Sequence, residues 1–439
     1  MDSTARETLE FLEENDIKFI RLAFCDIFGV QKNIAVMASQ LGHALEHGVA
    51  FDASAIAGFG GVARSDLLLR PDLSTFTVLP WRPAESGVGL VFCNITYPDG
   101  RPFEGDGRWL LGQLEQRALR QGYSFLVGPE CEFYLFETDE KGRPTHTPFD
   151  EAGYFDIAPL DKGENVRRQI CLALEEMGVQ PERSHHEQGP GQNEVDFRCA
   201  SPLAAADHLV ALRTAVKATA RENGLFASFS PKPLANKSGS GLHINLSLFF
   251  GGHNLFEGFC QAPNEKAAAF LAGVLAHAAE CMPFTNPLPG SYARLGGFEA
   301  PGTVSWSPHN RSCLVRVPAA TGQDSRIELR SPDPMANPYL VCAVTLAAGL
   351  DGIERGLRLP AETELTDAGL SDRELRELGC APLPRNLQEA LDLFENSPLM
   401  RDALGEHIHS FFLRKKRAEW EKYTSIVTEW EVQQYLASS

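Results

Sequence analysis

Carboxylate side chains and one histidine gather in four short segments of this sequence. Glu130 and Glu132 lie at positions i and i+2 of Gly-Pro-Glu-Cys-Glu-Phe-Tyr-Leu-Phe, a strand pattern that projects both side chains from one face. Two bare carboxylates on one face repel each other and lose hydration when partly buried. We therefore expect a cation between them, and several carboxylates with one imidazole suit Mg²⁺ or Mn²⁺ better than zinc.

The other three segments supply further acids and the histidine. They are His185-His186-Glu187 with Glu194 beyond it, Gly239-Ser-Gly-Leu-His243, and Arg326-Ile-Glu328-Leu-Arg330. In the last segment, Arg326, Glu328 and Arg330 share one strand face, which suits metal and anion binding together. Any one of these glutamates alone is most simply a solvated surface acid. Their number favours two metal ions rather than one.

The length, composition and net charge limit the class of protein. The 439 residues, 43% hydrophobic and 22% charged, suit an ordinary globular enzyme of about two or three domains. The net charge of −18 argues against a general binder of nucleic acid or anionic membrane, which needs a basic face. The first residues lack the features of a signal peptide. No apolar run of roughly 18 residues predicts a membrane span.

The ten cysteines are scattered, with no Cys-x-x-Cys pair. Without an export signal they are interpreted as reduced thiols, so the cytoplasm is the expected location. Cys131 lies between two of the glutamates and is, by position alone, a candidate ligand or nucleophile. On a strand its side chain points to the opposite face, so we expect it to pack in a core.

Periodicity predicts a mixture of helices and strands. Helices are expected over 4–14, 40–47, 107–122, 165–177, 204–222, 387–396 and 400–423. Strands are expected over 18–25, 33–36, 75–79, 88–95 and up to 136, with a loop over 51–59. The first two strands form a hairpin, and 98–106 is typical of a domain junction. Because neither strict βαβ alternation nor an internal repeat is visible, the predicted class is α+β.

Nucleotide-binding motifs give no support to a common nucleotide fold. The sequence has no P-loop. Gly58-Phe-Gly60-Gly-Val-Ala63 fits Gly-x-Gly-x-x-Ala, but no clear strand leads into it and no acid follows at the required distance. A Rossmann site is therefore rejected, and any nucleotide must be bound by other means.

At the four acidic segments, and over essentially its whole length, the sequence resembles type I glutamine synthetases. The joint order of the matching motifs is far more specific than any one of them. They are Phe51-Asp52-x-Ser54, Gly153-Tyr154-Phe155, Asn286-Pro287, Ser291-Tyr292, Phe298-Glu299-Ala-Pro301, Asn310-Arg311-Ser312, the segment 326–330 and Asp333-Pro-x-Ala-Asn-Pro-Tyr339.

The resemblance implies an N-terminal β-grasp domain, expected over 1–104. It implies a C-terminal catalytic domain over 105–439, with a barrel-like antiparallel sheet and flanking helices. The implied reaction joins ammonia to glutamate with ATP, through γ-glutamyl phosphate, in nitrogen assimilation. The implied assembly is a dodecamer of two stacked hexamers with shared active sites. A nitrogen-regulatory protein is a further suggested partner.

Residue roles follow from the resemblance position by position. One Mg²⁺ or Mn²⁺ ion is assigned to Glu132, Glu187 and Glu194, and a second to Glu130, His243 and Glu328. The implied ATP contacts are Glu182, Ser247, Arg311, Arg316 and Arg326. The implied substrate contacts are Tyr154, Gly239, Arg294 and Arg330. Arginines and metal ions are needed because two anions approach each other in the reaction, although a single arginine more often forms a surface ion pair worth under about 1 kcal/mol.

Ammonium must be captured and must lose a proton before it attacks. The resemblance assigns its pocket to Asp52, Tyr154, Glu187 and the flap residue Glu299. Asp52, Glu299 and Arg311 are the implied catalytic residues. Anionic side chains favour NH₄⁺, and Glu299 would take the proton and shield the acyl phosphate from water. For Asp52 alone, a loop acid that makes an Asx turn is the competing interpretation.

Several positions depart from the family pattern. Ala55 replaces a second serine beside the ammonium pocket, Ser238 replaces an asparagine that contacts glutamate, and Asn245 replaces a frequent histidine. The stretch 364–385 lacks the tyrosine that is adenylylated in the longer subtype. Gly61 stands near the place where the short, feedback-inhibited subtype carries a regulatory arginine.

Two other functions stay open beside glutamate–ammonia ligase, the predicted activity. A γ-glutamyl ligase that takes an organic amine or polyamine needs room and an apolar wall in its acceptor pocket. Asp52 argues against this alternative, whereas Ala55 leaves some space. A catalytically silent relative should have lost a metal ligand or the flap glutamate, and none is lost here.

Overall fold

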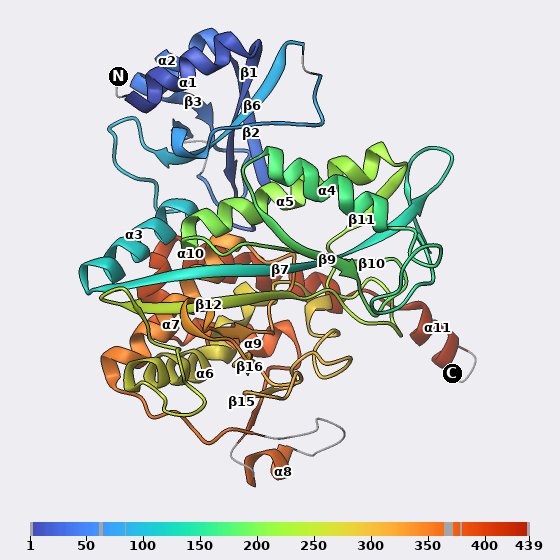
Figure 1. The fold of residues 1–439 in the computed structure, drawn as a ribbon. Helices are drawn as coiled ribbons and strands as arrows, with labels where there is room; N and C mark the ends of the chain where they lie inside the picture. Colours follow the sequence, from blue (N-terminus) through green and yellow to red (C-terminus); the bar gives the residue numbers. More distant parts are fainter. Residues whose placement is uncertain (1–2, 61–64, 84, 364–371, 378–379, 437–439) are drawn as a thin grey trace.

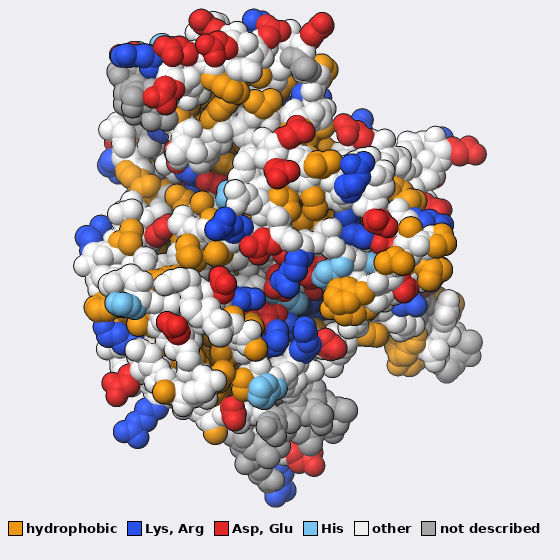
Figure 2. Space-filling view, in the orientation of Figure 1, with side chains coloured by type: hydrophobic (Ala, Val, Ile, Leu, Met, Phe, Trp, Pro, Cys, Tyr) orange, Lys and Arg blue, Asp and Glu red, His pale blue; other side chains and the backbone are white. Residues whose placement is uncertain are grey.

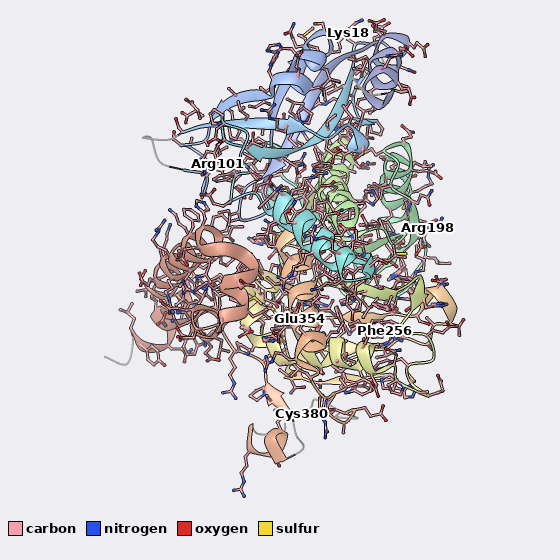
Figure 3. All side chains as sticks on the ribbon, turned by 90° about the vertical axis from the view of Figure 1, so that its left-hand side faces the viewer. Lys18, Arg101, Arg198, Phe256, Glu354 and Cys380 are labelled. Carbon is pink, nitrogen blue, oxygen red and sulfur yellow. The ribbon has the colours of Figure 1, made fainter. Side chains whose placement is uncertain are left out.

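The computed structural model describes residues 3–60, 65–83, 85–363, 372–377 and 380–436. A small N-terminal sheet stands above a larger C-terminal sheet, with helices between them (Figure 1). Lys18 and Arg101 mark the N-terminal part, whereas Arg198, Phe256 and Glu354 mark the C-terminal part (Figure 3). Separate helices beside largely antiparallel sheets confirm the predicted α+β class.

The N-terminal sheet has six strands: β1 (Ile17–Cys25), β2 (Gln31–Met37), β3 (Val49–Asp52), β4 (Asp66–Pro71), β5 (Thr77–Val78) and β6 (Gly87–Thr96). Two helices accompany it, α1 (Ser3–Glu14) and α2 (Leu41–His47). The strand order is β2-β1-β6-β4-β3, with β5 beside β6. β1 and β2 form the predicted antiparallel hairpin, and β1 pairs in parallel with β6. Ile20 and Leu22 on β1 are fully buried in the core.

Two segments of this sheet differ from the predictions. The loop predicted over 51–59 begins as a strand, because β3 extends to Asp52 and pairs with β4. The strand predicted over 75–79 is reduced to the two residues of β5. Asp72 accepts the Ser74 amide at 3.2 Å and caps a 3₁₀ turn there, a local side-chain bond that competes with strand pairing.

The C-terminal sheet has ten strands, and the longest is β7 (Tyr123–Thr138). The others are β8 (Pro144–Pro148), β9 (Pro181–His186), β10 (Gln192–Phe197), β11 (Leu225–Ser228), β12 (Leu242–Phe250), β13 (His253–Asn254), β15 (Trp306–Ser307), β16 (Val315–Arg316) and β17 (Ile327–Leu329). The main path is β15-β16-β17-β12-β7-β10-β9. A separate pair joins β14 (Thr303–Val304) to β18 (Ala381–Pro382).

The helices of the C-terminal part are α3 (Gly107–Arg120), α4 (Glu164–Glu176), α5 (Pro202–Glu222), α6 (Glu265–Thr285), α7 (Pro338–Arg355), α8 (Asp372–Glu377), α9 (Leu387–Glu395), α10 (Pro398–Thr424) and α11 (Glu429–Tyr435). Most of them pack beside its sheet, whereas α8 and α11 lie away from it (Figure 1). α4 and α5 lie between the N-terminal sheet and β7, whereas α6 and α7 lie beyond β12 (Figure 1). Each helix predicted from periodicity is present, and α10 bends at Gly405, where φ is 72°.

Among the described helices, α6 is the one long and apolar enough to cross a membrane by length and composition. Yet 72% of its apolar window is buried inside the fold. Gly273 on α6 and Gly352 on α7 allow very close packing, since a Cβ on either would lie 2.2 or 2.1 Å from a backbone oxygen of the other helix. α6 is therefore a core helix.

The ten cysteines are all free thiols, as predicted. Cys131 on β7 is fully buried. Burial raises the pKa of its thiol to about 12, so the thiolate needed for nucleophilic attack or metal binding is disfavoured. The predicted packing role of Cys131 is confirmed.

Candidate active site

Antiparallel pairing brings the four acidic segments together. Glu130 on β7 lies opposite His243 on β12, and Glu132 lies opposite Glu194 on β10. β17 pairs with the other edge of β12 and brings Glu328 beside it. Because side chains alternate along a strand, these residues share one face of the sheet.

This face opens into a cavity of about 390 Å³. Figure 2 shows acidic, basic and histidine side chains gathered at the centre of the view, over β7, β9 and β12. Most of the predicted site residues line the cavity: Glu130, Glu132, Tyr154, Glu187, Glu194, Gly239, His243, Arg294, Glu299, Arg311 and Arg330. A larger cavity, about 570 Å³, lies between the two parts of the chain around Arg108 and contains none of them.

The three residues predicted for the second ion converge. His243 Nδ1 lies 3.2 Å from Glu130 Oε2 and 3.5 Å from Glu328 Oε1. Asn245 Nδ2 donates to Glu130 Oε1 at 2.9 Å. Burial opposes the charge on Glu130, but the hydrogen bonds from His243 and Asn245 outweigh it and lower the pKa of Glu130 to about 2. Glu130 is therefore ionised at neutral pH, as its predicted role requires.

Glu194 lies between the two predicted sets of metal ligands. The Glu194 carboxylate belongs to two clusters, in each of which the possible ligand atoms lie within 4.8 Å of one another. One cluster contains Glu130 and His243, and the other contains His185 and Glu187. His185 Nε2 lies 3.1 Å from Glu194 Oε1, and its Nδ1 lies 3.5 Å from Glu187 Oε1. The histidine thus holds two predicted ligands of the first ion in place.

Glu132 is oriented by donors from two other segments. The Gln192 side chain donates to Glu132 Oε2 at 2.8 Å, and the Gly241 amide donates to the same oxygen at 2.9 Å. The other oxygen of Glu132 lies 3.8 Å from His243 Nε2. One oxygen of Glu132 is therefore fixed by the protein, while the other faces the predicted ligand His243.

Burial and like charges raise the pKa of three other acids in the cluster, Glu187, Glu194 and Asp196. Burial first, and then Glu132, raises the pKa of Glu187 to about 8. Burial and Asp196 raise the pKa of Glu194 well above its ordinary range, and burial with Glu130 raises that of Asp196 to about 7. A divalent cation relieves this repulsion, so the donor set fits Mg²⁺ or Mn²⁺.

A third group, Asp150, Asp161 and His186, also brings three ligand atoms within 4.8 Å. Its carboxylates are already occupied. Asp150 lies 2.9 Å from His186 Nε2 and accepts three backbone amides, and Asp161 pairs with Arg167 at 2.5 Å. We interpret this group as the anchor of the loop over 150–163 rather than as a metal site.

Two predicted anion-binding arginines flank Glu328. Arg316 Nη1 donates to Glu328 Oε2 at 3.0 Å, and Arg330 pairs with the other oxygen. Each keeps a buried Nε with no hydrogen-bond partner in the described part of the chain. Arg326 is bonded to β12 just outside the cavity, and Arg311 lines the cavity wall. This leaves guanidinium donors for an anion.

The residues 231–241, here named the amino-acid loop, form a tightly packed wall. A Cβ on Gly239 would lie 2.3 Å from Pro231 O and 2.8 Å from Arg294 Cγ, so only glycine fits. Arg294 is buried and donates to three backbone carbonyls of the segment that follows β17. The Ser238 hydroxyl donates to Gln192 Oε1 at 2.5 Å. Ser238 is therefore committed to Gln192 at the position where the family has a glutamate-contacting asparagine.

The residues 294–302, here named the flap, form another wall. Phe298 and Glu299 both have positive φ, 50° and 65°, a conformation that residues other than glycine rarely adopt. This backbone sets Glu299 on the cavity wall. Tyr154, also on the wall, stacks on Phe155 with ring centroids 4.0 Å apart, and both rings meet His185 edge-on.

Six predicted site residues do not line the cavity. Three of them, Glu328, Arg316 and Arg326, lie beside it on or next to β16 and β17, and the other three are Asp52, Glu182 and Ser247. Asp52 ends β3 in the N-terminal sheet, is exposed, and accepts the Ser54 amide at 2.9 Å in an Asx turn. Glu182 is exposed on β9. Ser247 donates to the Ser325 carbonyl at 2.9 Å. A single chain therefore brings the predicted metal ligands, arginines and flap together but leaves Asp52 apart.

Some predictions fall outside the described residues. Gly61 and the end of the motif over 58–63 are among them, and so is much of the stretch 364–385. The described part of the motif packs on α10, where the Gly58 carbonyl lies 2.6 Å from His407 Nε2. Ala55 is described, and it is exposed.

Gln192, His185 and Arg183 contact predicted ligands, although no sequence motif assigned them a role. Arg183 reaches two acids, Asp196 at 3.1 Å and Glu130 at 3.7 Å. A signal was available for Gln192, which lies two residues from a predicted ligand on one strand and so shares its face. His185 and Arg183 also alternate along β9, but only the pairing of β9 with β10 makes their partners visible.

Comparisons with known proteins agree with this geometry. The family models "Glutamine synthetase, beta-Grasp domain" and "Glutamine synthetase, catalytic domain" match residues 16–98 and 104–435. The glutamine synthetase of Clostridium saccharobutylicum is 47% identical to this chain, and the match covers 99% of this chain and 98% of the relative. The glutamine synthetase of Thermus thermophilus is 44% identical, and the match covers 100% of both chains.

Solved structures also match. One of them, "GmaS/ADP complex-Conformation 1", is 32% identical with a TM-score of 0.88, covering 98% of this chain and 99% of its own. The fold of Plasmodium falciparum glutamine synthetase matches with a TM-score of 0.87 at 23% identity, covering 99% of each chain. With two family models spanning both parts and relatives matched over their full length, this chain belongs to the glutamine synthetase family of ligases.

Proposed function

We propose that this protein joins ammonia to glutamate with ATP, giving glutamine, ADP and phosphate. The observation that supports this best is the single cavity whose wall combines acids, a histidine, arginines and the flap glutamate. A reaction between two anions needs such a set, because metal ions and guanidinium groups must offset the charge of the transferred phosphoryl group. A catalytically silent relative would have no use for this arrangement.

Two Mg²⁺ or Mn²⁺ ions fit the acidic cluster. The proposed ligands are Glu132, Glu187 and Glu194 for one ion, and Glu130, His243 and Glu328 for the other. When bound, the ions supply positive charge beside the phosphates of ATP. His185 and Gln192 would orient the ligands from behind, as outer residues do in metal sites.

The arginines support a place for ATP. Arg311, Arg316 and Arg326 would stabilise the negative charge on the phosphate oxygens. A cavity of about 150 Å³ lies beside Arg326 and includes Phe256 and Phe259 in its wall, an apolar surface that suits a nucleobase. The nucleotide contacts carried over by resemblance are Glu182 and Ser247. An adenine nucleotide also agrees with the fold match to a GmaS/ADP complex.

Glutamate would lie on the amino-acid loop. Gly239, Arg294 and Arg330 are the proposed contacts of its carboxylates. The γ-carboxylate oxygen attacks the γ-phosphorus of ATP, and ADP leaves. Ammonia then attacks the acyl carbon of γ-glutamyl phosphate, and phosphate leaves with the oxygen that glutamate contributed. Both steps balance without a further reactant.

Ammonium capture is assigned to Asp52, Tyr154, Glu187 and Glu299. Negative side chains favour NH₄⁺ over neutral molecules, and Glu299 would accept the proton that ammonium loses. Because Asp52 lies apart from the cavity within one chain, we propose that a neighbouring subunit supplies it.

A homo-oligomer, here proposed as two stacked hexamers, also has support at the C-terminal end. α11 projects from the body of the molecule (Figure 1). Trp430 and Tyr435 on it are each 61% exposed, and Val427 just before it is 73% exposed. Apolar side chains in such a projecting segment favour contact with another copy of the chain. The free thiols agree with the proposed cytoplasmic location.

A second candidate is a γ-glutamyl ligase that uses an organic amine. The fold match to GmaS and the small side chain of Ala55 favour it. Steady-state kcat/KM with glutamate, ATP and Mg²⁺ should be measured for ammonium, methylamine, ethanolamine and putrescine. We expect ammonium to give the highest value. If a primary alkylamine is preferred over ammonium, the second candidate replaces the first.

A further inference from the structure

We propose that Lys232 is a positioning residue that latches the flap to the amino-acid loop, so that closure of the flap depends on the state of the glutamate site. The inference rests on the proposed function, in which the flap shields γ-glutamyl phosphate from water. It adds a residue outside the metal, nucleotide and ammonium sets.

A single ammonium group touches both segments. Lys232 Nζ lies 4.7 Å from the centroid of the Phe298 ring, next to Glu299 on the flap. The same nitrogen donates to the Lys237 carbonyl at 2.5 Å, which closes the turn just before Ser238. A cation over an aromatic face is attracted to it. Lys232 therefore joins the tip of the flap to the turn that presents the amino-acid pocket.

The flap has few other restraints near its tip. The backbone hydrogen bonds at Gly296 and Ala300 stay within the flap. A Cβ on Gly296 or Gly297 would meet no atom within 4 Å, and Phe298 is 55% exposed. Left-handed φ at Phe298 and Glu299 persists only where the surroundings hold it. The Lys232 contact supplies that restraint from outside the flap.

The base of the flap already packs against the same loop. Gly239 and Gly241 approach Arg294 so closely that a Cβ on either would lie within 2.8 Å of its side chain. Glutamate bound at Gly239 and Arg294 would therefore order the loop from which Lys232 reaches the flap. With the latch in place, water is excluded from the acyl phosphate. Without it, water attacks and gives glutamate and phosphate instead of glutamine.

The test measures phosphate released per glutamine formed, at saturating glutamate, ATP, Mg²⁺ and ammonium. Lys232→Met keeps the stem and loses the charge, Lys232→Arg keeps a cation, and Phe298→Leu removes the ring. Lys266→Met is the matched control, because Lys266 Nζ lies 3.5 Å from the Phe250 ring centroid and neither residue lines the cavity. Thermal unfolding midpoints show that each variant is folded.

The wild-type ratio should be one. Lys232→Met and Phe298→Leu should each raise it at least threefold and raise the KM for ammonium, while Lys232→Arg restores most of the coupling. A variant that carries both Lys232→Met and Phe298→Leu should give the same ratio as the more affected single variant, because both changes break the same contact. Lys266→Met should behave as wild type.

Two results would overturn the latch. One is a ratio of one in Lys232→Met that still forms glutamine. The other is a double variant whose effects multiply, which would show independent roles. If the wild-type protein itself forms no glutamine, the proposed function is wrong. That result differs from a failure of the latch alone, in which the wild-type protein still forms glutamine.

Discussion

At the residue scale, Glu187 links the acidic cluster to pH. Its pKa of about 8 in the folded chain exceeds its ordinary value of 4.5. Between these values the folded protein holds a proton that the unfolded chain has released. The stability that this proton confers is complete below pH 4.5 and is lost as the pH rises to about 8. A bound cation replaces the proton and removes this dependence.

We therefore expect the thermal unfolding midpoint in EDTA to decrease as the pH rises from about 6 to about 8.5. With saturating Mg²⁺ it should decrease much less. Differential scanning fluorimetry across that range measures both. Glu187→Gln has no such proton, so its midpoint in EDTA should fall less with pH than that of the wild-type protein, and the fall that remains belongs to Glu194 and Asp196, whose pKa values are also raised. Equal slopes for the wild-type protein with and without Mg²⁺ would contradict this role of the cluster.

Glu132 and Glu328 test the assignment of the two ions. Glu132→Ala and Glu328→Ala should each reduce glutamine formation by more than about 100-fold, because a missing ligand costs more than a missing outer residue. Gln192→Ala removes only the bond that orients Glu132, so a loss of roughly 10-fold is expected. Circular dichroism should show an intact fold in each. Normal turnover in either glutamate variant would refute the two-ion site.

Strand alternation predicted that Glu130 and Glu132 share a face, and the structure agrees. The sequence could not show that His185 lies between Glu187 and Glu194, or that Ser238 turns to Gln192. Those contacts depend on how β9 pairs with β10 and on how the amino-acid loop packs. Neither arrangement leaves a periodic signal in the chain.

At the element scale, the close contact of α6 and α7 depends on glycine. Gly273→Ala would place a Cβ 2.2 Å from the Ala348 carbonyl, and rigid backbone cannot yield cheaply. We expect a loss of roughly 1–3 kcal/mol, measured as a lower thermal midpoint. Gly112→Ala on α3 is the control, because its Cβ would meet only Leu203 at 3.7 Å. That change should be neutral or stabilising by up to about 1 kcal/mol.

Amphipathic helices were predictable, whereas the largely buried helices α6 and α7 and the strands that depend on distant pairing were not. Helices α3, α4 and α5 follow from apolar spacing alone, and each appears near its predicted bounds. β3 was missed because four residues that pair with β4 carry too little pattern. β16 and β17 are shorter still, with two and three residues. β17 was found through the motif at 326–330, because three residues carry too little alternation to predict a strand.

At the scale of the whole molecule, the separation of Asp52 from the cavity predicts a site shared between subunits. Asp52→Ala and Glu328→Ala should each be inactive alone. Refolding the two together should restore a fraction of the activity, since some mixed sites then contain both intact residues. Glutamine formation measures recovery, and native mass spectrometry confirms mixed assemblies. Mixed assemblies with no recovered activity would contradict a shared site.

The central claim is that one cavity joins glutamate to ammonia through γ-glutamyl phosphate. It is tested most directly by supplying glutamate labelled with ¹⁸O in its γ-carboxylate, together with ATP, Mg²⁺ and ammonium. Mass spectrometry should find one ¹⁸O in each phosphate released and an equal amount of glutamine formed. Phosphate that carries no ¹⁸O, or phosphate released without glutamine, would contradict the proposed reaction.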